Sequence, residues 1–179
     1  MKLSFVFLSV FFCGFGSMIA QGSFPDSWIG NYKGTLEIYG IDSVKMKANM
    51  ELKIAATRND SIYDWHIKYE FNGKEDLRNY SLRLVDLNKG HYHIDEKNSI
   101  VIDSYLFNRN KLSSVFSVEN NMIMVKYSLE SDHIIFELWS VDQQQKNSTG
   151  KGVFDGNTVP EVNSYMINGQ QRAILKKSI

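Results

Sequence analysis

Two histidines and an aspartate that could bind a metal ion lie at alternate positions in one short segment. In an extended strand, His91, His93 and Asp95 would point to the same side. Two histidines at this spacing can both reach one Zn²⁺ ion, and a carboxylate can supply a third ligand. The segment is short and ends in a turn, which favours an ordinary solvent-exposed face with Tyr92 and Ile94 pointing inward. We therefore assign no metal site, and a metal-dependent site at His91 and His93 stays an alternative.

The other polar residues form no pattern that is typical of a catalytic centre. The Gly-x-Ser-x-Gly turn of hydrolases is absent, and so are phosphate-binding glycine loops. Carboxylates such as Asp64 and Glu70 offer no preferred pair for acid–base chemistry. His66 and His133 are isolated and indicate neither a haem nor a further metal ligand. The sequence favours a protein that is not an enzyme, and no cofactor is expected.

Arg78 is the charged residue whose position is most unusual. It shares its parity with Tyr80, Leu82 and Leu84, so the alternation predicts that its side chain points inward. A buried guanidinium needs a partner, and its planar fork suits a carboxylate. The alternative is that Arg78 lies at the mouth of the fold and reaches water, or pairs with an internal acid such as Asp103.

The first twenty residues have the composition of a secretory leader. Lys2 precedes an apolar run over residues 3–12, and Ala20 suits the position before a cleavage site. The run is shorter than the ~20 apolar residues that a membrane-spanning helix needs. We therefore predict that residues 1–20 are a signal peptide of bacterial type and that the mature chain is periplasmic or secreted.

Cysteine content and charge restrict the possible chemistry further. Cys13 is the only cysteine and lies in the leader, so the mature chain has no disulfide and no thiolate ligand. The bulky residue before Cys13 disfavours lipid attachment. The formal net charge is zero, and loss of Lys2 leaves 19 of the 20 basic residues against 20 acidic ones. Without a basic stripe, neither nucleic acid nor an anionic membrane surface is an expected partner.

Alternation with a period of two dominates the rest of the chain. It is clear over residues 28–39, 44–56, 63–71 and 78–84, where apolar residues occupy one parity and polar residues the other. Polar turns rich in Asn, Asp and Gly separate these segments and predict antiparallel hairpins. Three later segments carry apolar residues at both parities and leave the inner face unassigned: 100–107, 122–129 and 133–141.

The segment over residues 142–160 differs from the rest because it is polar and has no periodicity. Its length is unusual for a connection inside a compact domain, so we expect a loop over or near the mouth of the fold. Residues 164–177 return to strand-like composition, with Gln171, Ala173 and Leu175 on one side.

These segments predict an all-β fold over residues 21–179, as one domain. An antiparallel up-and-down meander avoids exposed edges by closing into a barrel of about eight to ten strands. Closure requires the last strand, near Ala173 and Leu175, to pair with the first, and Trp28 is expected to plug the closed end. A two-sheet sandwich is the second possibility.

The apolar leader, the aromatic-glycine-aromatic opening and the uninterrupted meander resemble the calycin superfamily, which includes lipocalins and fatty-acid-binding proteins. Residues 28–32 resemble the Gly-x-Trp opening of that superfamily in a different order. Residues 28–38, 89–100 and 105–107 are also similar to a group of small exported bacterial proteins of unknown function. The calycin resemblance implies a cup-shaped barrel that binds a small apolar molecule, with Arg78 available to an acidic head group.

The resulting hypothesis is an exported, non-enzymatic barrel that binds a small hydrophobic or amphipathic ligand, such as a lipid. Aromatic and methionine side chains could line a cavity or fill it, so a filled barrel acting as a structural or protein-interaction module is the alternative. The residues expected to bind the ligand are Tyr32, Leu36, Met46, Met50, Trp65, Tyr69, Arg78 and Tyr80.

Overall fold

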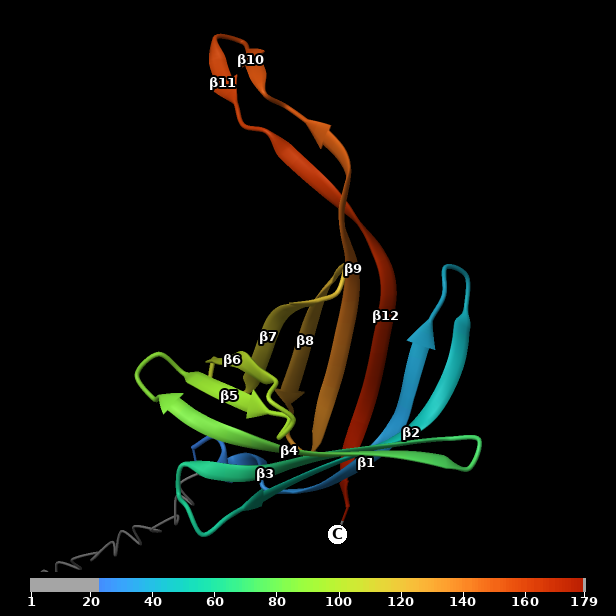
Figure 1. Ribbon diagram of the computed structural model, residues 1–179, viewed down its shortest axis with the longest axis vertical. Coiled ribbons are helices and arrows are strands. Elements are labelled where there is room, and N and C mark those ends of the chain that lie inside the picture. Colours follow the sequence, from blue (N-terminus) through green and yellow to red (C-terminus); the bar gives the residue numbers. More distant parts are fainter. Residues whose placement is uncertain (1–22, 179) are drawn as a thin grey trace, which may run out of the picture.

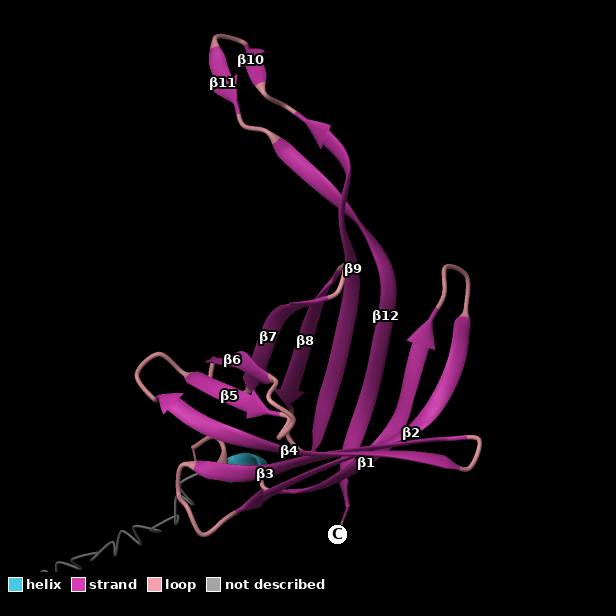
Figure 2. Cartoon of the chain, viewed as in Figure 1, coloured by secondary structure: helices cyan, strands magenta, loops and turns pink. Residues whose placement is uncertain are grey.

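The computed structural model describes residues 23–178 of the chain, so the predicted signal peptide, residues 1–20, and Cys13 lie outside the described residues. Ten antiparallel strands form a closed barrel, and two further strands form a small separate sheet (Figure 1). Strands make up 74% of the described chain, and its only helix is a short 3-10 turn (Figure 2). The predicted all-β fold is confirmed.

The elements follow one another along the chain in a simple order. The 3-10 helix η1 (Asp26–Trp28) precedes twelve strands. These are β1 (Gly30–Tyr39), β2 (Val44–Ala56), β3 (Ile62–Phe71), β4 (Lys74–Asp86), β5 (His91–Asp95), β6 (Val101–Phe107), β7 (Lys111–Val118), β8 (Asn121–Leu129), β9 (His133–Thr149), β10 (Gly152–Phe154), β11 (Asn157–Val159) and β12 (Val162–Ser178).

Each strand from β1 to β9 pairs with its neighbour in sequence, as expected for a meander. β12 pairs with β9 on one side and with β1 on the other, and this second pairing closes the barrel. Leu36 lies opposite Ala173 in that pair, and both side chains are buried. The pairing of first and last strands is therefore confirmed, and the sandwich alternative is wrong.

Aromatic side chains fill the end of the barrel where β1 begins. Trp28 is fully buried there, in η1 and not in the strand itself. The ring centroids of Phe24 and Trp28 are 4.9 Å apart, and those of Trp28 and Trp65 are 6.3 Å apart. Tyr92 and Tyr127 complete the group through edge contacts with Phe24 and Trp65. We call these five residues the aromatic plug. Trp28 therefore lies at the closed end of the barrel, as the sequence predicted.

The segment predicted as a loop, residues 142–160, is instead a two-stranded arm. β9 and β12 have 17 residues each and continue past the barrel, where they pair with each other alone, and β10 and β11 form a hairpin at the tip (Figure 1). Both faces of the arm lie in water, so no alternation of polar and apolar residues is required. Apolar and polar residues alternate along a strand because one of its faces is buried, so a two-stranded ribbon without a buried face shows no alternation.

No helix within residues 23–178 is both long enough and apolar enough to cross a membrane. This agrees with the sequence, which contains no long apolar run after the leader. The N-terminal apolar run lies outside this range.

Gly34 of β1 lies against the backbone of β12. A Cβ atom at this position would overlap the carbonyl oxygen of Ile174, which belongs to the backbone and cannot swing aside. The absence of a side chain therefore permits the close crossing of the two strands that close the barrel.

We expect Gly34→Ala to lower the free energy of unfolding by about 2 kcal/mol, because the strands must separate to admit the methyl group. Urea unfolding followed by circular dichroism measures this change. The matched control is Gly152→Ala in β10, where an added Cβ meets no atom within 4 Å. Equal stability of the two variants would contradict the close-approach argument.

Candidate ligand cavity in the barrel

A cavity of about 110 Å³ lies inside the barrel next to the aromatic plug. Trp65 and Tyr127 belong both to the plug and to the cavity lining, so they form the boundary between the filled and the open parts. The inward faces of β3 to β9 supply most of the remaining wall. The lining residues are Trp65, Ile67, Tyr69, Arg78, Tyr80, Ile94, Glu96, Ile102, Ser114, Phe116, Val125, Tyr127, Phe136 and Leu138.

A second hollow of about 280 Å³ adjoins this cavity. It shares Tyr69, Arg78 and Leu138 with the first, so these three side chains stand between the two spaces. The rest of its wall comes mainly from β1 and β2, including Leu36 and Met46. The open half of the barrel thus contains two adjacent apolar spaces with Arg78 at their common border.

Arg78 lies at this border with its side chain 45% exposed. Its Nη2 atom is 3.0 Å from Oδ2 of Asp76, and its guanidinium carbon is 5.0 Å from the centroid of the Tyr69 ring. The structure therefore supports the mouth position, with the carboxylate partner two residues away on the same strand. The alternative of a pair with Asp103 is wrong, because Asp103 lies on the outer wall and contacts histidines there.

Burial raises the pKa values of the tyrosines around the cavity. It raises the pKa of Tyr69 to about 12, although the nearby Arg78 charge acts in the opposite direction. Burial also raises the pKa of Tyr127 well above its ordinary value and raises that of Tyr80. A tyrosine is already a neutral phenol at physiological pH, and the raised pKa values keep these side chains neutral to a more alkaline pH, so each can donate a hydrogen bond.

The structure distributes the eight predicted ligand residues among three places. Trp65, Tyr69, Arg78 and Tyr80 line the first cavity, and Leu36 and Met46 line the second hollow. Tyr32 and Met50 line neither space and are almost completely buried. The Tyr32 hydroxyl donates to the Trp28 carbonyl at 3.0 Å, which ties it to the filled end.

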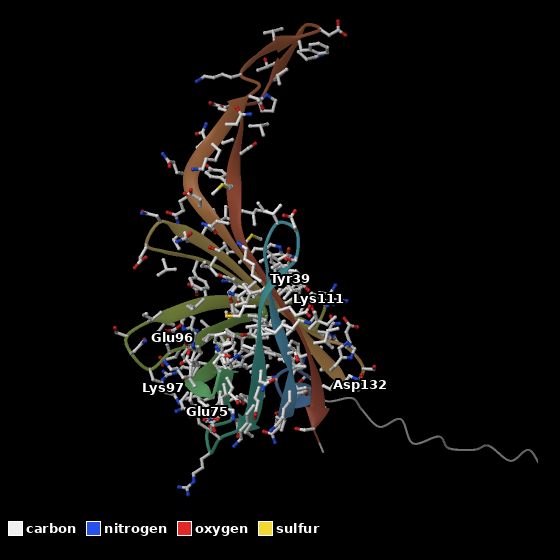
Figure 3. The ribbon with its side chains drawn as sticks, turned by 90° about the vertical axis from the view of Figure 1, so that its right-hand side faces the viewer. Tyr39, Glu75, Glu96, Lys97, Lys111 and Asp132 are labelled. Carbon is white, nitrogen blue, oxygen red and sulfur yellow. The ribbon has the colours of Figure 1, made fainter. Side chains whose placement is uncertain are left out.

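Sequence reasoning missed the wall contributed by β5 to β9. Ile94, Ile102, Ser114, Phe116, Val125 and Leu138 all line the cavity. The outer faces of β6 and β8 also carry exposed apolar residues, including Val101, Tyr105 and Met124, and these hid the alternation in those two strands. The nearby turn after β5 holds Glu96, another lining residue, beside Lys97 (Figure 3).

A separate polar cluster lies on the outer wall of β5 and β6. His91 and His93 point away from the cavity, as the sequence predicted for a solvent-facing side of this strand. Asp95 does not join them, because it pairs with Arg83 at 2.8 Å. Asp103 of β6 takes its place and contacts both histidines. The hydrogen bond from His91 is the main cause of the lowered pKa of Asp103.

The sequence matches no protein-family model and no curated protein. The barrel, its cavity and the residues around them are therefore the grounds for a functional proposal.

We expect Tyr69→Phe to make stability less sensitive to alkaline pH. The pKa of Tyr69 is raised from 10.0 to about 12 in the folded protein. The contribution of this shift to the free energy of unfolding is therefore complete below pH 10 and is lost as the pH rises through 12. Urea unfolding midpoints between about pH 9 and pH 12 should therefore decline less steeply in the variant. Tyr165→Phe, on the exposed arm, should decline like the unmodified protein. A Tyr69→Phe decline as steep as that of Tyr165→Phe would contradict the expectation.

Proposed function

We propose that this protein is an exported, non-enzymatic barrel that binds a small apolar or amphipathic molecule in its open half. The observation that carries the proposal is the aromatic and aliphatic cavity beside the plug, with one guanidinium at its mouth. Mostly apolar walls with a few placed polar groups are typical of small-molecule sites. The calycin resemblance of the sequence supports the same class of ligand.

The size of the cavity restricts the ligand. A dry cavity of about 150 Å³ can hold benzene, whereas drug-sized ligands occupy about 300–1,000 Å³. The inner cavity, at about 110 Å³, suits a narrow apolar end, and the adjoining hollow of about 280 Å³ offers room for more of the molecule. We therefore favour a slender ligand, such as a medium-length alkyl chain, over a bulky one.

Arg78 supports an acidic head group on that ligand. Its guanidinium is held against the Tyr69 ring and by Asp76, and it remains 45% exposed. A ligand carboxylate can replace Asp76 on the planar fork, since that pair is open to water and contributes little stability. The apolar chain would then extend past Tyr69 into the cavity.

Filling the cavity should remove binding. We expect Val125→Phe, which adds a ring to the lining, to weaken binding of anilinonaphthalene sulfonate and of decanoate about tenfold or more, because the ring occupies the ligand's space. The control is Val115→Phe, the same change on the outer face of β7, where the side chain is 57% exposed. Fluorescence titration with decanoate as competitor measures both variants.

A third variant in the same titration tests whether Arg78 binds the acidic head group of the ligand. Arg78→Gln should weaken decanoate binding and leave decanol binding unchanged, because only the carboxylate uses the guanidinium. Equal binding by Val125→Phe and Val115→Phe, or the absence of any bound molecule in native mass spectrometry of protein from its own source, would contradict the proposal.

A filled barrel acting as a structural or protein-interaction module is the second candidate. The aromatic plug favours it, because Trp28 and Trp65 are fully buried and fill that end of the barrel. The cavity favours the ligand-binding proposal, because a module of this kind needs no apolar space in its interior. The titration above separates the two.

The proposal of export concerns residues 1–20, which lie outside the described residues. We expect the mature chain to begin at Gln21, because Ala20 suits the position before a signal-peptidase cut. Intact-mass measurement of protein isolated from the cell envelope or the medium of its source checks this. A chain that retains Met1 and residues 2–20 would contradict it.

A further inference from the structure

The outer wall of the barrel carries a set of metal-binding side chains that the proposed ligand site does not use. β5 and β6 are antiparallel neighbours, with His93 directly opposite Asp103. His91 and His93 lie on the outer face because the alternate residues, Tyr92 and Ile94, are buried inside the barrel. Three side chains from two adjacent strands therefore meet on one small area of the surface.

Their metal-binding atoms converge on one point. Nε2 of His91 is 2.5 Å from Oδ1 of Asp103, and Nε2 of His93 is 3.3 Å from the same oxygen. All three atoms lie within 4.8 Å of one another. Ligands of a tetrahedral ion with bonds of about 2.1 Å lie roughly 3.4 Å apart. The His93–Asp103 distance is already close to this value, the His91–Asp103 contact must widen, and the ring nitrogens of His91 and His93 lie within 4.8 Å of each other.

The surrounding contacts hold the histidine rings in place and leave the aspartate able to move. The His91 ring stacks on Tyr105 with 4.8 Å between centroids, and the His91 and His93 rings meet edge to face at 5.2 Å. The side chain of Asp103 is 60% exposed, so its carboxylate can shift to admit an ion.

Neighbouring charges do not oppose a cation at this point. Arg83 of β4 lies opposite His93 in the sheet and would repel a metal ion if it were free. Its guanidinium is instead held by Asp95 at 2.8 Å, which neutralises it. On the other side, Asp86 lies opposite His91, and its carboxylate pairs with Lys89 at 3.5 Å.

We infer that His91, His93 and Asp103 form a Zn²⁺-binding site on the outer wall of the barrel. Two imidazole nitrogens and one carboxylate oxygen suit a borderline ion, and the fourth position is open to water. Mg²⁺ and Ca²⁺, which prefer oxygen ligands, are poor occupants. The site is independent of the proposed ligand function.

The metal has a structural consequence for the cavity. β5 is only five residues long, and β6 has seven. The inward residues of the same two strands, Ile94 and Ile102, line the cavity. A Zn²⁺ ion that joins His91 and His93 to Asp103 links the two strands from outside and stabilises this part of the cavity wall.

Zinc binding can be measured on the mature chain after treatment with EDTA and dialysis. Calorimetric titration should give one Zn²⁺ per chain, and Co²⁺ should give the intense visible absorption of a tetrahedral site. His93→Gln and Asp103→Asn should each weaken Zn²⁺ binding about 100-fold, because loss of a ligand costs at least as much as loss of the groups that orient it. Zn²⁺ should also raise the unfolding temperature of the unmodified protein.

His66→Ala and His133→Ala are the matched controls, because each histidine is partly exposed beside a single aspartate. They should bind Zn²⁺ like the unmodified protein. The double variant His91→Ala/His93→Ala should show neither the Co²⁺ absorption nor the thermal shift, with its fold checked by circular dichroism. Zn²⁺ affinity of the unmodified protein no higher than that of this double variant would overturn the inference and leave a simple histidine–aspartate hydrogen-bonded cluster.

Discussion

The packing of the aromatic plug determines where the barrel can hold a cavity. Ten strands enclose more space than side chains from the walls alone fill readily. The 3-10 helix carries Trp28 into this space, where Phe24 and Trp65 pack against it. One half of the barrel is thereby filled, and the space that remains is displaced toward the opposite end. The cavity and Arg78 both lie in that remaining half.

The sequence predicts a strand and its inner face reliably only where one face is exposed to solvent and the other is buried. β2 shows this best, since Met50, Leu52 and Ile54 are buried while Lys47 and Lys53 are exposed. The strands β6, β8 and β9 carry apolar residues at both alternating positions, so their inner face could not be assigned from the sequence. The arm has no buried face, so its sequence shows no alternation of apolar and polar residues. All-β topology and closure were therefore predictable, whereas the path of residues 142–160 was not.

The same physical limits apply to the sites. Parity along one strand placed Tyr69, Tyr80 and Arg78 on the correct face, but it could not tell how deep in the barrel each residue lies. Tyr32 shares that inward parity and lies in the filled half instead. Parity also grouped the two histidines, but the third member of the cluster comes from the next strand. That neighbour depends on the pairing register, which spacing along one strand does not reveal.

Closure by the first and last strands has a consequence for the order in which the molecule is assembled. The Ser178 hydroxyl donates to the Asn31 carbonyl across 147 residues of sequence. During synthesis, successive hairpins can form as they emerge, but one edge of β1 has no partner until the final strand appears. Contacts of such long range form slowly, and an open strand edge invites pairing with other chains. The nascent molecule is therefore most prone to aggregation in the interval before its last seventeen-residue strand is complete.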